Sequence, residues 1–511
     1  MAVFFNHDRY VIPNWRSFER TVSLGELSAN KNVLSANSFS EKDLADYYTD
    51  WKLSKNVAHA GDMISAAISN NCINNKETIE VANYILNNKE NSTPILQETA
   101  TLIISSNEQN ENSTINSDNL FIETQELLHI YAELHKYRIL LSRYPSNSIY
   151  YVEMSRLYLS LGMKDKAERQ IEYALYLAPT NRFVIRSAVR LYIHLGEKEK
   201  AYYILKKTSK MNDPWLLAPE ISLCMIIGKP QNTIKKSLSI IESNNYSPFN
   251  ITELASSLAT LEFETGNNKK SKKLFERSLI SPNDNALAQV QWANNHKLNI
   301  SFDNRILFSN FSFNEANAWF EYQNKNFKTA LQYANEWAID LPFARSPIYF
   351  AFYISNTYLK DFELSERILK KGLTANCADS GLLNNLAYVY ALQNKTDEAL
   401  QTISKIDTDK EIGNSTRVCI EATKGLIYFR SGFFDLGRQY YLKAIEDTMK
   451  FNEPEINWLA ILNYAREELI LNSEYADKVM QLVERIPSTK NDEIIELQKE
   501  VMILNQKRSK L

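Results

Sequence analysis

A pattern of residues that is written twice between Ser148 and Pro214 constrains this chain more than any other feature. The two copies are thirty-four residues apart, and three positions keep their residue type: Tyr158 recurs as Tyr192, Gly162 as Gly196 and Ala167 as Ala201. A fixed period of about 20 to 50 residues is typical of chains in which one small unit is stacked in series. Because such a unit buries its core against its neighbours, the chain is not expected to form a few ordinary globular domains.

Each copy has the pattern of two helices joined by a tight turn. Apolar and small residues fall at helical spacing on both sides of the turn, with Tyr151, Met154, Ser155 and Tyr158 before it and Ala167, Ile171 and Ala174 after it. Gly162 ends the first helix, and Pro179 stops the second. The pattern therefore predicts a helix hairpin with an open apolar face, which the next hairpin covers.

These residues resemble the tetratricopeptide repeat, whose signature has a bulky residue, Leu-Gly and Tyr, followed by Ala, an aromatic residue and Pro. Met154 stands at the Leu position of that signature and Ser155 at the Gly position. The resemblance implies an all-α fold, a right-handed superhelical solenoid of antiparallel helix hairpins. It also implies a concave surface lined by the first helix of each hairpin.

The repeat pattern continues far beyond these two copies. Further hairpins centre on Gly228 and Gly266, and the motif is clear again around Tyr390 and Gly432. The array up to Gly432 is close to eight periods long, so we expect about nine or ten hairpins over residues 120–487.

One stretch breaks the period. Residues 298–313, with the sequence LNISFDNRILFSNFSF, show no helical stripe of the kind seen on either side. We expect an irregular segment or a shortened helix there.

Residues 1–118 do not carry the repeat and are expected to form a helical N-terminal segment. Helical patterns occur at about 56–70, 77–87 and 94–105. The segment is expected to end in a polar loop or linker at about 105–119, because that stretch is nearly free of apolar residues.

The C-terminal residues 488–511 predict one amphipathic helix. Ile494, Leu497, Val501 and Leu504 follow one another at spacings of 3, 4 and 3. A helix that caps the last repeat is favoured over a dimerisation helix, since two heptads are too short for a coiled coil. The sequence does not indicate the oligomeric state.

Composition agrees with a helical chain and narrows its class. Only 12 glycines and 13 prolines occur, and a net charge of −3 points neither to direct nucleic-acid binding nor to a membrane surface. The four cysteines form no close pair, which argues against a disulfide framework and a zinc site. We see no signal peptide and no apolar run of membrane-spanning length, and we expect a cytoplasmic protein.

No catalytic or cofactor motif stands out. The sequence has no glycine-rich phosphate loop, no H-E-x-x-H, no G-x-S-x-G and no C-x-x-C. His129 and His135 are six residues apart and so do not share one helix face as residues i and i+4 would. We therefore expect no enzymatic activity, no cofactor and no metal site.

The clearest repeats carry the densest set of candidate partner-binding residues. If they follow tetratricopeptide repeat geometry, the concave positions of the first two repeats hold Arg156, Phe183, Arg186, Arg190 and His194, and similar positions of later repeats hold Asn356, Asn384 and Tyr388. Arginines suit an acidic peptide or a C-terminal carboxylate, and asparagines can bind an extended backbone. An ordinary solvated helix face would account for the same residues.

Two functions remain open at this stage. The first is a non-enzymatic scaffold or adaptor that binds a peptide or protein partner in the concave groove. The second is a peptide- or protein-sensing regulatory subunit of a bacterial signalling, stress or phage-defence system. Direct DNA binding is not expected, because the segment ETIEVANYILN within residues 77–87 is not basic as a recognition helix would be.

Overall fold

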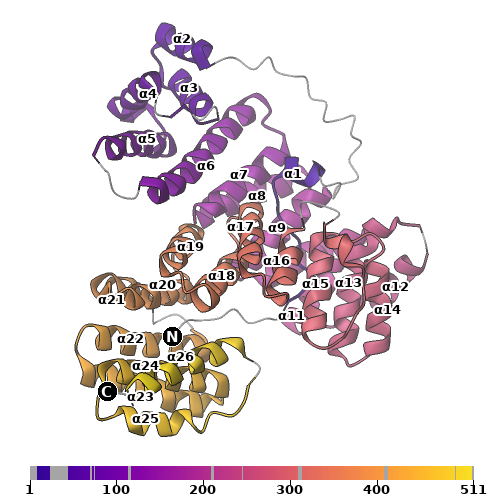
Figure 1. The fold of residues 1–511 in the computed structure, drawn as a ribbon. Helices are drawn as coiled ribbons and strands as arrows, with labels where there is room; N and C mark the ends of the chain where they lie inside the picture. Colours follow the sequence, from indigo (N-terminus) through magenta and orange to yellow (C-terminus); the bar gives the residue numbers. More distant parts are fainter. Residues whose placement is uncertain are drawn as a thin grey trace. The chain divides into compact units, whose positions relative to one another are not determined.

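A computed structural model shows an all-helical chain (Figure 1). It describes residues 9–23, 44–69, 72–73, 75–112, 117–208, 212–243, 245–308, 313–407, 412–489 and 491–508. Every regular element in these ranges is a helix, as the all-α prediction requires. Contacts divide the chain into two compact units, which are described separately here: unit 2 is Val11–Thr265, and unit 1 is Met1–Tyr10 together with Gly266–Leu511.

Unit 2 begins with a small helical bundle. Its helices are α2 (Leu44–Ser54), α3 (Val57–Ser69), α4 (Lys76–Asn87), the short η2 (Lys89–Asn91), α5 (Pro94–Asn112) and α6 (Ser117–Arg143). The short helix α1 (Phe18–Ser23) precedes them in the chain. The helices α3 and α5 both pack on α6. The core of this bundle contains Trp51, Met63, Ile64, Val81, Ile85, Leu96, Ile103 and Leu128.

The close contact between α3 and α6 depends on Gly61. A Cβ atom at this position would lie 2.6 Å from Cε1 of His135 on α6, which is closer than real Cβ contacts. Glycine is therefore the residue that lets the two helices approach at this point.

The repeat array of unit 2 follows directly. Its helices are α7 (Ser148–Ser160), α8 (Lys164–Leu177), α9 (Arg182–Leu195), α10 (Lys198–Thr208), α11 (Pro214–Ile227), α12 (Ile234–Glu242) and α13 (Pro248–Glu264). The pairs α7–α8, α9–α10 and α11–α12 are hairpins, and the first helices α7, α9, α11 and α13 also contact one another in sequence. The two copies recognised in the sequence are therefore stacked hairpins.

Local chemistry explains where these hairpins begin and how closely they pack. Asn147 accepts a hydrogen bond from the amide of Ile149 and so caps the start of α7, and Asn181 caps α9 in the same way. Within the first hairpin, Ser155 Oγ donates a 2.7 Å hydrogen bond to the carbonyl of Ala167, and both residues are fully buried. The small side chains thus let the two helices of the hairpin touch at the backbone.

Unit 1 continues the same construction. Its helices are α14 (Asn268–Ser278), α15 (Asp284–Asn295), α16 (Asn314–Gln323), α17 (Phe327–Asp340), α18 (Arg345–Tyr353), the π-helix η5 (Ile354–Tyr358), α19 (Phe362–Ala375), α20 (Ser380–Leu392), α21 (Thr396–Ile403), α22 (Asn414–Arg430), α23 (Phe434–Phe451), α24 (Pro454–Leu471) and α25 (Ala476–Val483). From α16 onward they pack as consecutive hairpins. The solenoid prediction is thereby confirmed, whereas its right-handed sense stays a prediction.

The turn between the two helices of a hairpin adopts a left-handed backbone conformation in most repeats. Gly162, Gly196 and Gly432 have φ values of 70°, 85° and 83° at this turn. Later hairpins place other residues there, with Lys325 at φ 62° and Asn394 at φ 59°. The geometry is therefore kept where glycine is absent, and this is why a search for glycine misses the hairpins that have Lys325 or Asn394 at the turn.

The break at 298–313 replaces a second helix. Residues of this stretch follow α15, and its regular structure in the described residues is one short 3-10 helix, η4 (Asn304–Phe308). Residues 309–312 lie outside the described part of the chain. The hairpin that α15 begins thus has no full-length partner helix among the described residues.

The helix α26 (Asp492–Arg508) packs on α24 and also reaches η5, more than 130 residues earlier in the chain. Its apolar stripe is buried at Ile494, Leu497 and Val501. Tyr358 donates a 3.0 Å hydrogen bond to the carboxylate of Asp492. The helix therefore contacts an earlier repeat as well as the end of the array.

The polar stretch at 105–119 differs from the expectation of a loop. The helix α5 extends to Asn112 and α6 begins at Ser117, while residues 113–116 lie outside the described residues. The stretch is polar, but it contains neither proline nor glycine, and polar side chains alone do not end a helix. The division of the chain at residues 118 and 487 stays a prediction.

The last hairpins are tied together by a buried ion pair. Glu468 on α24 is fully buried and accepts hydrogen bonds from Nε and Nη2 of Arg438 at 2.7 and 3.1 Å. The same arginine also pairs with Asp435, whose side chain is 91% exposed. One arginine therefore carries a buried and an exposed carboxylate partner, which makes a matched comparison possible.

We expect Glu468→Gln to lower the free energy of unfolding by about 2–4 kcal/mol, because it leaves the charge of Arg438 without its buried counter-charge. Asp435→Asn should leave stability unchanged, since exposed ion pairs contribute little. Urea denaturation followed by circular dichroism measures both variants. Equal changes in the free energy of unfolding for the two variants would show that the buried pair stabilises the fold no more than the exposed pair.

Candidate functional site

The first helices of the hairpins carry buried polar side chains that a simple helix pair does not need. In unit 1, Asn285 and Gln289 on α15 and Asn314, Glu315 and Asn317 on α16 are all less than 9% exposed. Buried polar groups are stable only where they find partners, so their partners identify what these helices hold.

Arg186, a candidate for partner binding, is engaged inside unit 2. Its guanidinium donates to both carboxylate oxygens of Glu253, at 2.9 and 3.2 Å, and to the carbonyl of Trp215 at 2.7 Å. It also lies over the Trp215 ring, and only 10% of its side chain is exposed. Its charge is thus neutralised within the unit by a carboxylate that is 67 residues away in sequence.

The other candidates on α7 and α9 lie in different surroundings. Arg156 pairs with the buried carboxylate of Glu153, with Nη2 and Oε2 3.2 Å apart. Phe183 is buried, whereas Arg190 and His194 are partly buried. Arg156, Arg190 and His194 are therefore the members of this set that keep some contact with solvent.

The candidates in unit 1 are not on a solvated face. Asn356, in η5, is 7% exposed, and Asn384 and Tyr388 on α20 are 0% and 6% exposed. Tyr388 donates a hydrogen bond to Oδ1 of Asn463 on α24, and burial raises the pKa of its hydroxyl. Tyr388 therefore serves a contact between repeats, and all three side chains lie away from solvent.

Phe18, the first residue of α1, lies against the first helices of unit 2, although no repeat pattern in the sequence marks it. The amide of Phe18 donates a 2.8 Å hydrogen bond to Oε1 of Glu153, and its ring packs edge-on against Phe183 with the centroids 5.2 Å apart. Burial raises the pKa of Glu153, although Arg156 and the amide of Phe18 both favour its charged form. Two residues of the repeats therefore already bind another part of the chain.

The preceding residues show the burial pattern of an extended chain. Val11, Pro13 and Trp15 are buried, while Ile12 and Asn14 between them are only partly buried. No helix is assigned to residues 9–17. An alternation with a period of two is expected when one side of an extended segment faces a protein surface.

The same segment makes a polar contact in unit 1. Arg9 donates to the carboxylate of Glu315 through Nε at 2.9 Å and Nη2 at 2.7 Å, to Gln289 Oε1 at 2.7 Å and to Asn285 Oδ1 at 2.9 Å. This site is not visible in the sequence, because Arg9 is at least 276 residues away from each of its three partners. A single arginine among 58 basic residues carries no pattern that could reveal it.

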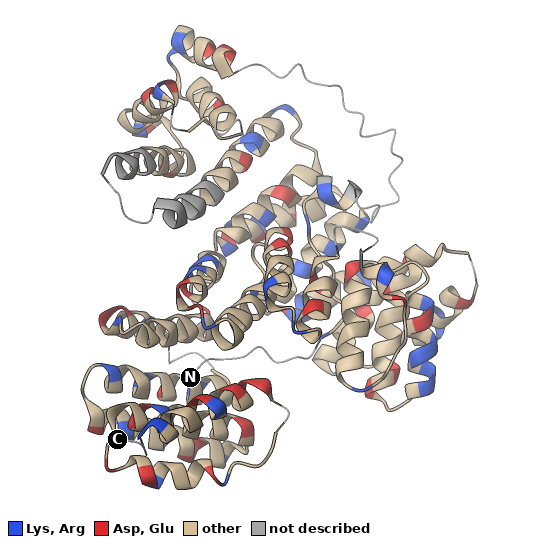
Figure 2. Cartoon of the chain, in the orientation of Figure 1, with Lys and Arg blue, Asp and Glu red and all other residues tan. Residues whose placement is uncertain are grey.

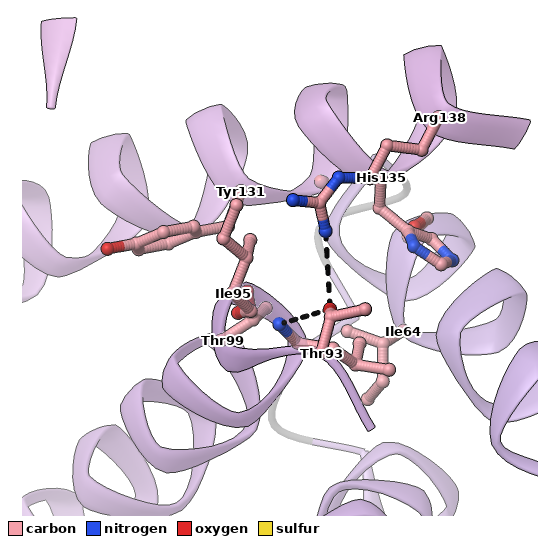
Figure 3. A pocket seen from close by; sticks show the side chains of 10 residues that line it. Ile64, Thr93, Ile95, Thr99, Tyr131, His135 and Arg138 are labelled. Atoms are coloured by element: carbon pink, nitrogen blue, oxygen red, sulfur yellow. Dashed lines mark hydrogen bonds between the residues drawn. The ribbon is translucent and has the colours of Figure 1, made fainter. Parts of the chain in front are cut away.

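A cavity in the N-terminal bundle is too small for a ligand. Figure 3 shows Tyr131, His135 and Arg138 of α6 facing Thr93 and Ile95 at the start of α5. The cavity has a volume of about 10 Å³, which is room for about one water molecule. Burial and the neighbouring charge of Arg138 lower the pKa of His135 to about 4, so the imidazole is neutral at neutral pH.

A larger cavity of about 200 Å³ lies beside the irregular stretch of unit 1. It is lined by Gln291, Asn294, Ile300, Ser301, Phe302, Asn304, Phe320 and Gln323. Asn294 holds the stretch in place, because its side chain bonds both the amide and the carbonyl of Ile300. The lining residues come from α15, the irregular stretch and α16.

Basic residues gather on α14, as the blue segments of this helix in Figure 2 show. Lys269, Lys270, Lys272 and Lys273 occur within five residues there. This helix belongs to unit 1. Charge of this kind raises solubility and long-range attraction without selecting a partner.

Among the residues that the structure describes, no group of three or more His, Cys, Asp or Glu side chains could hold a metal ion. The same residues contain no helix that is long and apolar enough to cross a membrane.

Comparison with known families bears on the first hairpin. The family model described as "Tetratricopeptide repeat" matches residues 149–181, which cover most of α7 and all of α8. Residues 149–181 are a tetratricopeptide repeat. The resemblance inferred from Tyr158, Gly162 and Ala167 is thereby confirmed for the first copy.

Two solved structures are similar to this chain at low identity. A monomeric mutant of IFIT1 with Gppp-AAAA is 11% identical, with a TM-score of 0.26, over 96% of this chain and 99% of that chain. Naa15/Naa10 bound to HypK-THB is 13% identical, with a TM-score of 0.25, over 91% and 80%. Both TM-scores are too low for a shared partner to follow from them. No curated protein matches this sequence.

The burial of Arg186 makes a prediction that separates stability from binding. Arg186→Glu should lower the free energy of unfolding by about 3–5 kcal/mol, because it removes a buried cation and places two carboxylates together. Arg169→Glu, on the exposed side of α8 in the tetratricopeptide repeat, is the matched control and should leave stability unchanged. Thermal and urea denaturation measure both. An equally stable Arg186→Glu variant would contradict the internal role of the ion pair.

Glu220 on α11 makes the stability of unit 2 depend on pH. Burial raises the pKa of this carboxyl to about 7, with Lys236 and Lys206 opposing the shift, and Oε2 accepts no hydrogen bond from the described part of the chain. The folded state therefore binds a proton more tightly than the unfolded state. Its contribution to stability is fully present below pH 4.5 and is lost as the pH rises toward 7.

We expect Glu220→Gln to be more stable than the wild type at pH 8, by up to about 3 kcal/mol, and the difference to shrink toward pH 4.5. Glu199→Gln, at an exposed position of α10, is the control. Urea denaturation at pH 5 and pH 8 measures both. A difference that does not change with pH would show that Glu220 is ionised normally in the folded chain.

Proposed function

We propose that this chain is a non-enzymatic scaffold that binds a peptide or protein partner against the first helices of its hairpins. Tetratricopeptide repeats stack into arrays whose first helices present one continuous face, and such faces bind extended segments. The described residues hold no cluster that could bind a metal ion, and the buried carboxylates at Glu153, Glu253 and Glu468 have structural partners.

The observation that carries the proposal is the contact of the chain's own residues with these helices. Phe18 bonds Glu153 and packs on Phe183, and both partners lie at positions of the repeats that we expected to face a ligand or stand beside such a position. A surface that binds one segment from outside the hairpins through a backbone amide can bind another of similar chemistry.

Burial reduces the set of residues that we expect to contact the partner. Arg156, Arg190 and His194 of unit 2 keep some exposure and remain candidates for an acidic partner, and Phe183 provides an apolar contact. Arg186 supports the site through Glu253 without donating to a partner.

A regulatory subunit is the second candidate, and one observation favours it. Within unit 1, Arg9 bonds to a first helix, and within unit 2, Phe18 bonds to a first helix. A chain whose binding helices are already occupied can change state when the occupant is replaced.

Photo-crosslinking tests the proposed function. A photoreactive residue at position 194, on the first helix α9, should capture a protein partner in the native cell, and the same residue at position 169, on the second helix α8, should not. Mass spectrometry of the products identifies the partner. Equal capture from both positions, or capture from 169 alone, would contradict binding along the first helices.

A further inference from the structure

Arg9 occupies a site that satisfies an arginine almost completely. Four hydrogen bonds engage Nε, Nη1 and Nη2, and two of them form a fork with the carboxylate of Glu315. The side chains of Arg9 and Glu315 are 15% and 9% exposed. Forked bonds with a carboxylate require a planar guanidinium, so this geometry selects arginine over lysine.

The site also binds the backbone of the residue that carries the arginine. Gln289 accepts from Nη1 of Arg9 through Oε1 and donates to the carbonyl of Arg9 through Nε2, both at 2.7 Å. The side chain of Gln289 thus forms hydrogen bonds with both the side chain and the main chain of Arg9. The site is suited to an arginine within a peptide, which presents both groups in fixed relation.

The acceptors are held in place by the repeats. Asn285 and Gln289 are one turn apart on α15, and Glu315 lies in the first turn of α16. Asp284 is 2% exposed and accepts from the amides of Glu315 and Ala316, at 3.3 and 2.9 Å, which fixes the start of α16 against α15. The pocket of acceptors is therefore built by the helices and not by Arg9.

The acceptors need a cation. Glu315 is buried as a carboxylate within α16, and a buried carboxylate without a counter-charge is strongly unfavourable. The cation comes from a segment that is not part of any hairpin and is 306 residues away in sequence from Glu315. Arg9 therefore occupies the site as a peptide ligand would, although it belongs to the same chain.

We propose that Asn285, Gln289 and Glu315 form an arginine-recognition site for extended peptides. The chain's own Arg9 is the resident occupant, and an arginine-bearing extended segment of a partner protein takes its place. The inference rests on the proposed scaffold function and adds the chemistry of the partner segment. It differs from the acidic partner expected from the sequence, because the acceptors here are a carboxylate and two amides.

Binding of a peptide in trans tests the site. The probe is a fluorescently labelled synthetic peptide with the sequence of residues 6–16, NHDRYVIPNWR, added to the full-length chain. Full-length Arg9→Ala, which empties the site, should bind the probe at least tenfold more tightly than the wild type, whose site is filled. Fluorescence anisotropy measures both.

Two controls assign the binding to the arginine fork. The same probe with lysine in place of Arg9 should bind full-length Arg9→Ala at least tenfold more weakly, and the Arg9→Ala, Glu315→Gln double variant should lose binding of the original probe to a similar extent. An affinity that stays the same in both controls would overturn the proposal.

A purely structural role of Arg9 is the rival explanation. If Arg9→Ala does not fold, Arg9→Lys is used in its place, since it keeps the charge without the fork. Failure of both variants to fold, or folded variants that do not bind the probe, would overturn the arginine site. Photo-crosslinking from position 194 does not depend on these results. It can therefore support the scaffold function when the peptide experiment rejects the arginine site, and the peptide experiment can give a result when crosslinking captures no partner.

Discussion

The helices that form the first layer of this solenoid are buried on several sides at once, and this constraint governs the rest of the structure. On α11, every residue from Pro214 to Cys224 is buried, because neighbouring helices contact α11 along its length. Any polar group on such a helix must find its partner inside the protein. The ion pair of Arg186 with Glu253, and the bonds of Arg9 with three side chains, are two solutions to the same requirement.

The fold could be predicted in large part because its signal is local. The spacing of Tyr158, Gly162 and Ala167 identifies a hairpin within thirty residues, and the same spacing one period later shows that hairpins are stacked. The irregular stretch at 298–313 was visible as a loss of that signal. The extension of helix into residues 105–112 was missed, since polarity alone does not break a helix.

The binding site could not be predicted to the same degree, because it depends on pairs that are distant in sequence. Arg186 has the residue type and the helix position of a peptide-binding arginine, and only the location of Glu253 shows that its charge is already used. Arg9 lies in a segment without any repeat pattern, and its acceptors are ordinary Asn, Gln and Glu residues of a first helix. Such pairs become visible only when the helices are placed in space.

The position of Arg9 also has a consequence for the order in which the chain is made. A ribosome adds about 5 to 20 residues per second, so Arg9 is exposed for roughly 15 to 60 s before Glu315 exists. Unit 1, which needs both, therefore cannot be completed until residues on both sides of unit 2 have been synthesised. During that interval Arg9 is accessible to chaperones or to another chain, and the separation of 306 residues adds a large loop-closure cost to the contact with Glu315.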